Sequence, residues 1–372
     1  MAGLIFVTGA PRSGTGLLAD RMAAGPGRRC IPQPVPLVLS GLKQAFLTRR
    51  AAPGQPTAYP LSDQQFATYT SPDEFTSYLE KAIPTREDWT RWLDSMDGYS
   101  GQYTRPATPL SGVEAMLGQP PLEAFSRYLI ANYKTPGAVK SIVWKETFAE
   151  EFVPGLLAAG HHCLIIVRDP RDSIASQFAG RGEQFVGGPR PLLFVCRQWR
   201  KSALFALAMS GTPGFHTVRF ESLARNPVST LCDGLPPEIA PDADEIGAAD
   251  GTPRNSSFSD TSVGSTQTIG RHKTHLSAKT NAFIEAICAA EMSALGYETS
   301  LTPGERKITI ERGFQDAENG RAELSHYLWN ESRRDEELSR LNAIQRPDCG
   351  FLPKAFLFER AYDRLRTAGN TR

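Results

Sequence analysis

A glycine-rich turn between an apolar run and a helix-prone segment constrains this chain more than any other feature. The run GLIFVT at residues 3–8 leads directly into GAPRSGTG at residues 9–16. A turn of this kind presents backbone N–H groups at the positive end of a helix, so it forms a cradle for an anion such as phosphate or sulfate. A purely structural strand-to-helix turn is the alternative, because glycine-rich turns are common.

Three more apolar, β-branched runs predict buried strands at residues 139–144, 163–167 and 215–220. Near-continuous apolar strands that alternate with helices are typical of a parallel sheet covered on both faces. We therefore expect an α/β fold with a doubly wound parallel sheet. The segments with helical patterns are 15–24, 73–81, 86–96, 148–159, 171–178, a stretch beyond 222, and 278–295.

The domain organisation follows from changes in composition along the 372 residues. Residues 1–300 are predicted to form the α/β domain, and residues 53–137 a mostly helical cap inserted over the carboxyl edge of its sheet. Residues 240–268 are rich in Asp, Gly, Ser and Thr, which indicates a loop. Residues 301–372 are predicted to be a helical extension whose charges lie on a solvated face.

The overall composition excludes several partners. Forty-one Lys and Arg against 40 Asp and Glu leave a net charge of +1, so no nucleic-acid partner is expected. No apolar run approaches the ~20 residues that a bilayer span needs. The six cysteines form no CxxC pair, which indicates reduced thiols, a cytoplasmic location and no zinc site. The sequence carries no signal for an oligomeric state.

A second anion-binding signal follows the third predicted strand, where the chain reads RDPRDSIAS at residues 168–176. Arg168 comes directly after the strand, and Ser176 can return toward the same anion on the following helix. A second phosphate would fit between them. Arg171 and Asp172 are interpreted as solvated pairs at the helix start.

The first turn differs from a nucleotide-triphosphate loop of the form GxxxxGK followed by Ser or Thr. Thr15 stands where the lysine belongs, and Gly16 stands where the Mg²⁺-binding hydroxyl belongs. An ordinary ATP or GTP enzyme is therefore disfavoured, although a kinase with an atypical P-loop stays as a weaker alternative.

With both motifs in order, the sequence resembles the sulfotransferases that use 3′-phosphoadenosine 5′-phosphosulfate (PAPS). The family's PRSGTT loop is similar to residues 11–16, and its RDPRD motif with a following Ser is similar to residues 168–176. Weaker similarity lies at residues 218–223, 255–258 and 270–297. The resemblance spans about 3–297 and is weak in the cap.

The resemblance implies a P-loop-like cradle and the site residues that bind PAPS, or its product adenosine 3′,5′-bisphosphate (PAP). It implies that the 5′-phosphosulfate lies on the loop after the first strand, the 3′-phosphate on the RDPRD motif, and later residues over the nucleotide. The implied residues are Arg12, Ser13, Gly14, Thr15 and Gly16 for the first group, Arg168 and Ser176 for the second, and Ser257, Arg271 and Lys273 beyond them. Gly16 replaces the family's usual second threonine.

The expected chemistry is transfer of a sulfuryl group to a hydroxyl or amine of a small-molecule or carbohydrate-like acceptor. Such a transfer needs in-line geometry and cationic groups, with Arg12 among them, and no metal is expected. Lys145 either reaches the site or is a solvated strand-end lysine.

The acceptor must also lose a proton to a base. Many relatives have a glutamate about twenty residues after the loop arginine, where this chain has Gln33. A glutamine cannot be the base, so Glu146 is the candidate, and Gln33 is assigned to the acceptor side. The histidines His161, His162, His272 and His275 are interpreted as surface residues. Gln33 also leaves open a non-catalytic protein that binds PAP or PAPS.

Overall fold

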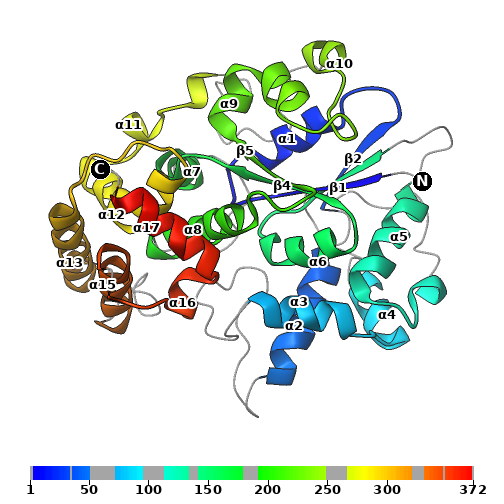
Figure 1. Ribbon diagram of the computed structural model, residues 1–372, viewed down its shortest axis with the longest axis horizontal. Coiled ribbons are helices and arrows are strands. Elements are labelled where there is room, and N and C mark those ends of the chain that lie inside the picture. Colours follow the sequence, from blue (N-terminus) through cyan, green and yellow to red (C-terminus); the bar gives the residue numbers. More distant parts are fainter. Residues whose placement is uncertain are drawn as a thin grey trace.

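Five parallel strands form one sheet at the centre of the molecule (Figure 1). The computed structural model describes residues 3–33, 36–50, 72–94, 113–133, 141–178, 192–248, 266–320, 331–346 and 348–370. The strands are β1 (Gly3–Thr8), β2 (Arg28–Pro32), β3 (Ser141–Lys145), β4 (His162–Val167) and β5 (Phe215–Arg219), in the spatial order β2-β3-β1-β4-β5. The predicted α/β fold with a parallel sheet is confirmed.

The strand order creates a switch point between β1 and β4. After β1 the chain runs toward β2 on one side of the sheet, and after β4 it runs toward β5 on the other side. Because all pairs are parallel, the carboxyl ends of the strands share one edge. Ligands of open α/β sheets bind outside the carboxyl ends of strands at such a switch point. Both anion-binding motifs of the sequence begin there.

Helices cover both faces of the sheet (Figure 1). On one face, Ile5 and Val7 of β1 pack with Leu18 of α1 (Thr15–Met22), together with α9 (Phe220–Arg225) and α10 (Ala243–Ala248). On the other face, Leu4 and Phe6 pack with a second apolar cluster. The helices of that face include α2 (Pro36–Arg50), α6 (Val153–Ala158) and α8 (Leu192–Met209).

The predicted insertion is helical where the structure describes it. Its elements are α3 (Pro72–Lys81), α4 (Arg86–Asp94), the 3₁₀ turn η1 (Val113–Met116) and α5 (Pro121–Tyr133). Phe75, Trp89 and Phe125 belong to the same apolar cluster as Trp144 of β3. These helices therefore pack against a face of the sheet through the apolar cluster that contains Trp144, and a position over its carboxyl edge stays a prediction. Residues 51–71, 95–112 and 134–140 lie outside the described part.

Several elements differ from the sequence-based expectation. The helix predicted at residues 148–159 begins late, because Phe148 has a φ of 65° and the chain first forms the 3₁₀ turn η2 (Glu150–Phe152). Residues 243–248 of the predicted loop form α10. The prediction lacked β2, α2 and α8. The remaining elements beside the sheet are α7 (Pro170–Phe178), η3 (Ser229–Asp233), η4 (Thr266–Thr268) and α11 (His272–His275).

The last part of the chain packs on the α/β core through buried ions as well as apolar groups. It follows α12 (Ala278–Ala294) and consists of α13 (Pro303–Gly320), α15 (Glu331–Gln345), α16 (Pro353–Phe356) and α17 (Glu359–Asn370). Glu337 is 3% exposed and bonds to Arg197 and Arg200 of α8. Arg340 is also buried and pairs with Glu291 of α12. The expectation that the charges of this segment are solvated is wrong for these residues, and a domain boundary near residue 300 stays a prediction.

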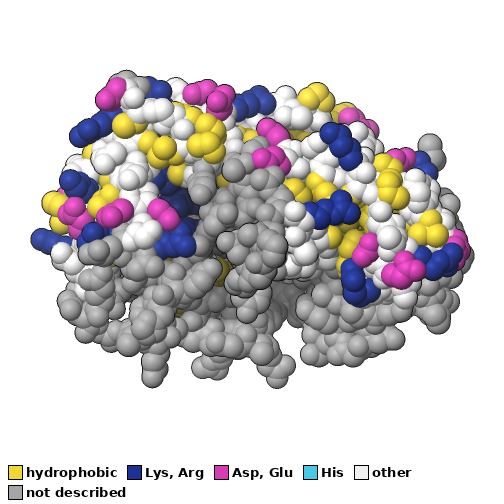
Figure 2. Space-filling view, turned by 90° about the horizontal axis from the view of Figure 1, so that it is seen from below, with side chains coloured by type: hydrophobic (Ala, Val, Ile, Leu, Met, Phe, Trp, Pro, Cys, Tyr) yellow, Lys and Arg dark blue, Asp and Glu magenta, His cyan; other side chains and the backbone are white. Residues whose placement is uncertain are grey.

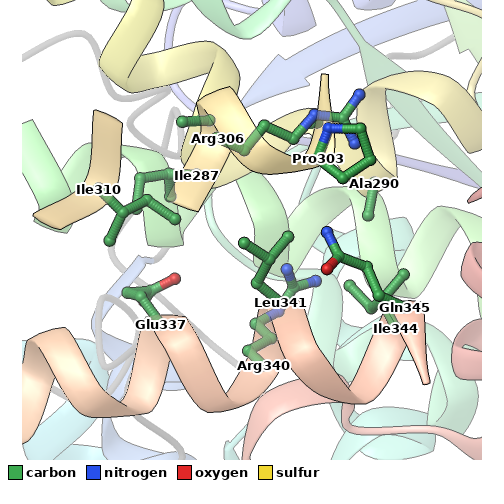
Figure 3. A pocket seen from close by; sticks show the side chains of 12 residues that line it. Ile287, Ala290, Pro303, Arg306, Ile310, Glu337, Arg340, Leu341, Ile344 and Gln345 are labelled. Atoms are coloured by element: carbon green, nitrogen blue, oxygen red, sulfur yellow. The ribbon is translucent and has the colours of Figure 1, made fainter. Parts of the chain in front are cut away.

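A small pocket of about 50 Å³ lies between α12, α13 and α15, lined in part by Arg306, Glu337 and Arg340 (Figure 3). Figure 2 shows acidic and basic side chains interspersed on the face seen from below, in keeping with the net charge of +1. None of the described helices is long and apolar enough to cross a bilayer.

Candidate functional site

The loop between β1 and α1 has a backbone that glycine makes possible. Gly14 precedes α1 with a φ of 98°, and a Cβ there would lie 2.5 Å from a ring carbon of Phe220. Arg12 also has a positive φ of 62°. No side chain caps the start of α1 at Gly14. The first N–H groups of this helix are therefore available to an anion.

Ser13 places an unsatisfied polar atom in this loop. The residue is fully buried, and its Oγ has no hydrogen-bond partner in the structure. A buried hydroxyl without a partner costs about 1–3 kcal/mol, so such atoms are rare unless a ligand or water completes them. Ser13 is therefore suited to bind a group that enters the loop.

Arg168 lies across the switch point from this loop. It is 6% exposed, and its guanidinium stacks 4.3 Å from the centroid of the Phe220 ring. Its Nη1 donates to the carbonyl of Arg12 at 3.2 Å, and its Nη2 donates to the carbonyl of Thr268 at 2.5 Å. Its Nε is buried and has no hydrogen-bond partner among the described residues. Burial lowers the pKa of Arg168, so the protein holds a cation there at a cost in solvation.

Arg12 adds a second, half-buried cation to the same place. Its Nε donates to Ser176 Oγ of α7 at 3.2 Å. Burial and then the nearby charge of Arg168 lower the pKa of Arg12 to about 10. An anion beside the two guanidinium groups would offset the repulsion that Arg12 experiences from Arg168. The structure thus brings together Arg12, Ser13, Arg168 and Ser176, all of them predicted from the two motifs.

The segment at residues 266–275 is fastened to the start of α7 by Asp172. This carboxylate accepts from the N–H of Gly270 at 2.7 Å, the N–H of His272 at 2.9 Å and His272 Nδ1 at 2.7 Å. The bond to His272 and the charge of Arg168 outweigh burial and lower the pKa of Asp172. Asp172 and His272 are both buried, so the interpretation of Asp172 as a solvated pair and of His272 as a surface histidine is wrong.

Arg271 and Lys273, which are expected to lie over the nucleotide, are more exposed than Asp172. Arg271 is half-buried, and its Nε donates to the carbonyl of Gln267 at 3.2 Å. Lys273 is exposed. Arg171 pairs with Asp169 at 2.7 Å and with Glu285 at 3.3 Å. Ser257 lies outside the described residues.

Lys145 and Glu146 diverge at the carboxyl end of β3. Lys145 is 8% exposed, and its Nζ donates to Gln33 Oε1 at 3.0 Å. The alternative of a solvated lysine is therefore wrong. Alternation along the strand sends Lys145 to the face of Val143 and α1, and Glu146 to the face of Trp144.

The surroundings of Glu146 favour the protonated form of its carboxyl group. It is 2% exposed, and Trp144 Nε1 donates to its Oε1 at 3.0 Å. Burial raises the pKa of Glu146 to about 7, against the smaller opposing effects of Trp144 and Lys145. A carboxyl group of this pKa can exchange a proton near neutral pH.

Thr15 and Gly16, the last two residues of the predicted loop motif, differ in burial. Thr15 is buried at the first position of α1, and Gly16 faces open space, with nothing within 4 Å of a Cβ built there. Sequence reasoning missed Phe220 and Thr268, which hold the Arg168 guanidinium. Phe220 directly follows β5 and could have been found from its place at the carboxyl edge, whereas no local pattern marks Thr268.

Comparisons with known proteins find a likeness among solved structures. No protein-family model matches the chain, and no curated protein matches it. Among solved structures, a sulfotransferase domain from the curacin biosynthetic pathway is similar, with 18% identity and a TM-score of 0.42. The match covers 81% of this chain and 99% of that chain. At this identity and TM-score, the likeness says nothing about a donor or an acceptor.

Proposed function

We propose that this protein is a sulfotransferase that moves a sulfuryl group from PAPS to a hydroxyl or amine of a small-molecule or carbohydrate-like acceptor. The observation that carries the proposal is the pair of unsatisfied, buried polar atoms at the switch point, Ser13 Oγ and Arg168 Nε. They belong to the two motifs that the resemblance assigns to the two phosphate groups of such a donor. Buried atoms of this kind fit a ligand with two anionic groups better than they fit a structural turn.

The residues of the first loop would hold the 5′-phosphosulfate. N–H groups at the start of α1 and the Ser13 hydroxyl would donate hydrogen bonds to it, and Thr15 and Gly16 begin the helix that orients them. When bound, the donor supplies the sulfuryl group and a phosphate as leaving group. Arg12 and Lys145 would stabilise the charge that develops on the leaving oxygen, because fixed cations need no reorganisation during the reaction.

The second motif would select the nucleotide. Arg168 and Ser176 would hold the 3′-phosphate, with Arg271, Lys273 and Ser257 beyond them. The charge-assisted hydrogen bonds of an arginine suit a phosphate. No step of this scheme requires a metal.

The proton of the acceptor needs a base within hydrogen-bond reach. Glu146 is our candidate, because its carboxyl group exchanges a proton close to neutral pH. Its side chain lies on the Trp144 side of the sheet, so an acceptor would approach from that side.

A second candidate function is binding of PAP or PAPS without transfer. The observation that favours it is Gln33, whose amide side chain cannot act as a general base and accepts a hydrogen bond from Lys145. Both candidates predict donor binding, and only the first predicts turnover.

The experiment that separates them is incubation of the purified protein with sulfur-labelled PAPS and a panel of hydroxyl and amine acceptors. We expect label in one acceptor class with release of PAP. Arg12→Ala should lower turnover by about 10- to 100-fold, since hydrogen bonds to charged groups contribute about 1.5–3 kcal/mol. Donor binding with no labelled product from any acceptor would favour the second candidate, and absence of donor binding would contradict both.

A further inference from the structure

Gln33 holds Lys145 by two separate contacts. The backbone N–H of Gln33 donates to the carbonyl of Lys145 at 2.7 Å, which extends the pairing of β2 and β3 by one residue. The side-chain Oε1 of Gln33 accepts from Lys145 Nζ at 3.0 Å. Gln33 has a φ of 45°, a conformation that L-residues rarely adopt. The chain thus turns sharply after β2 at the residue whose amide meets the lysine.

Lys145 has no carboxylate partner in the described part of the chain. Its hydrogen bond goes to the neutral amide of Gln33, and no ion pair joins its Nζ to a described Asp or Glu. The carboxylates that influence it from a distance are Glu146 and Asp20, and Arg12 opposes them. A buried lysine without a counter-ion is costly, so such residues are rare unless the charge has a use.

The position of Lys145 in the sheet indicates what its charge could do. Lys145 ends β3, which neighbours β1, and the loop after β1 carries Arg12 and Ser13. The ammonium group therefore contributes positive charge beside the anion cradle. A glutamate at position 33 would neutralise this charge, whereas a glutamine holds the lysine and leaves its charge intact.

We propose that Gln33 is a positioning residue that anchors the Lys145 ammonium beside the anion cradle through a neutral amide, so that the lysine is available to an anionic donor. This inference rests on the proposed function for the identity of the anion, which we take to be PAP or PAPS. It does not make Gln33 a catalytic residue, because its side chain acts through Lys145.

The contact itself is tested by nuclear magnetic resonance of the full-length protein labelled with carbon-13 at lysine Cε. The Lys145 signal is assigned by its loss in Lys145→Met, and its pKa is measured by titration without any ligand. Gln33→Glu should raise the pKa of Lys145 by about 1–3 units, as opposite charges in contact do. Gln33→Met has a similar length and no acceptor, and it should not raise this pKa. An equal pKa in the wild type and Gln33→Glu would overturn the inference.

The effect on anion affinity is tested by calorimetric binding of PAP to the wild type, Gln33→Glu and Gln33→Met at low salt. Gln33→Glu should weaken binding by about tenfold through loss of one net positive charge, and added salt should reduce this difference. Gln33→Met should also weaken binding, because the lysine is no longer held, and retained melting temperatures show that the variants fold. Equal PAP affinity in all three would overturn the inference. If the wild type binds no PAP, the proposed function fails, while the lysine titration still decides whether Gln33 positions Lys145.

Discussion

Two buried arginines in this molecule have opposite surroundings. Arg200 of α8 bonds to both oxygens of Glu337, and this carboxylate outweighs the effect of burial and raises the pKa of Arg200. Among the described residues, Arg168 hydrogen-bonds to two carbonyl groups and its Nε has no partner. Burial lowers its pKa and outweighs the opposing charges of nearby carboxylates such as Asp172. A carboxylate bonds to the guanidinium of the first arginine, whereas no described carboxylate bonds to that of the second. Burial of a charge is therefore no sign of function until its partners are known.

The largest effect is expected where the paired ions are broken. Glu337→Gln removes the buried carboxylate shared by Arg197 and Arg200 and leaves Arg200 buried without it, which should cost about 3–5 kcal/mol of the free energy of unfolding. Glu336→Gln is the matched control, because Glu336 is 46% exposed and its pair with Arg197 should contribute less than about 1 kcal/mol. Denaturant titration of both variants measures the difference. Equal losses would mean that the buried cluster does not stabilise the packing of α15 on α8.

The next effect is a pH dependence of stability. It concerns two buried glutamates whose pKa values are shifted in opposite directions. Arg200 and Arg197 outweigh burial and hold the pKa of Glu337 at about 2, while burial raises that of Glu146 to about 7. A raised pKa in the folded state provides stability that is full below the unfolded pKa and is lost as the pH rises through the folded pKa.

Glu146→Gln removes this dependence because the amide has no charge at any pH. Relative to the variant, the wild type should lose about 3 kcal/mol of its free energy of unfolding between about pH 5 and pH 8. Denaturant titrations across this range test it. Parallel curves for the two proteins would show that Glu146 ionises as an exposed carboxylate does, and would remove the reason to consider it as the base.

The smallest effect separates two glycines of the first loop. Gly16→Ala should leave stability equal or raise it by up to about 1 kcal/mol, since Gly16 is helical and faces open space. Gly14→Ala should destabilise the protein, because its Cβ meets Phe220 and its φ is 98°. Melting temperatures of the two variants provide the test. If both are tolerated equally, the contact between the loop and Phe220 is looser than the structure describes.

The sequence allowed much of the sheet to be predicted, because β1, β3 and β4 are mostly apolar runs buried on both faces. The strand β5 lies at an edge and is recognised by its buried Phe215 and Val218. The sequence did not reveal β2, whose segment RRCIP carries two arginines and lies at the sheet edge. Helix α8 was also missed, since its buried face includes charged residues that need distant partners such as Glu337.

The candidate site also contains residues that the sequence predicts and residues whose roles it does not reveal. Arg12, Ser13, Arg168 and Ser176 follow from local motifs and meet at the switch point. The roles of Asp172 and Gln33 depend on contacts with residues about a hundred positions away, and no local pattern encodes such contacts.

Recognition of a 3′-phosphate by Arg168 is tested by calorimetric binding of PAP and of adenosine 5′-phosphate, without metal, to the wild type and to Arg168→Ala. We predict that the wild type prefers PAP by at least about tenfold, because a charged hydrogen bond to the 3′-phosphate contributes about 1.5–3 kcal/mol. Arg168→Ala should bind both nucleotides alike, with a cooperative melting transition as the control that it stays folded. Equal affinities of the wild type for the two nucleotides, or an unchanged preference in Arg168→Ala, would contradict the assignment of Arg168 as an anion-binding residue.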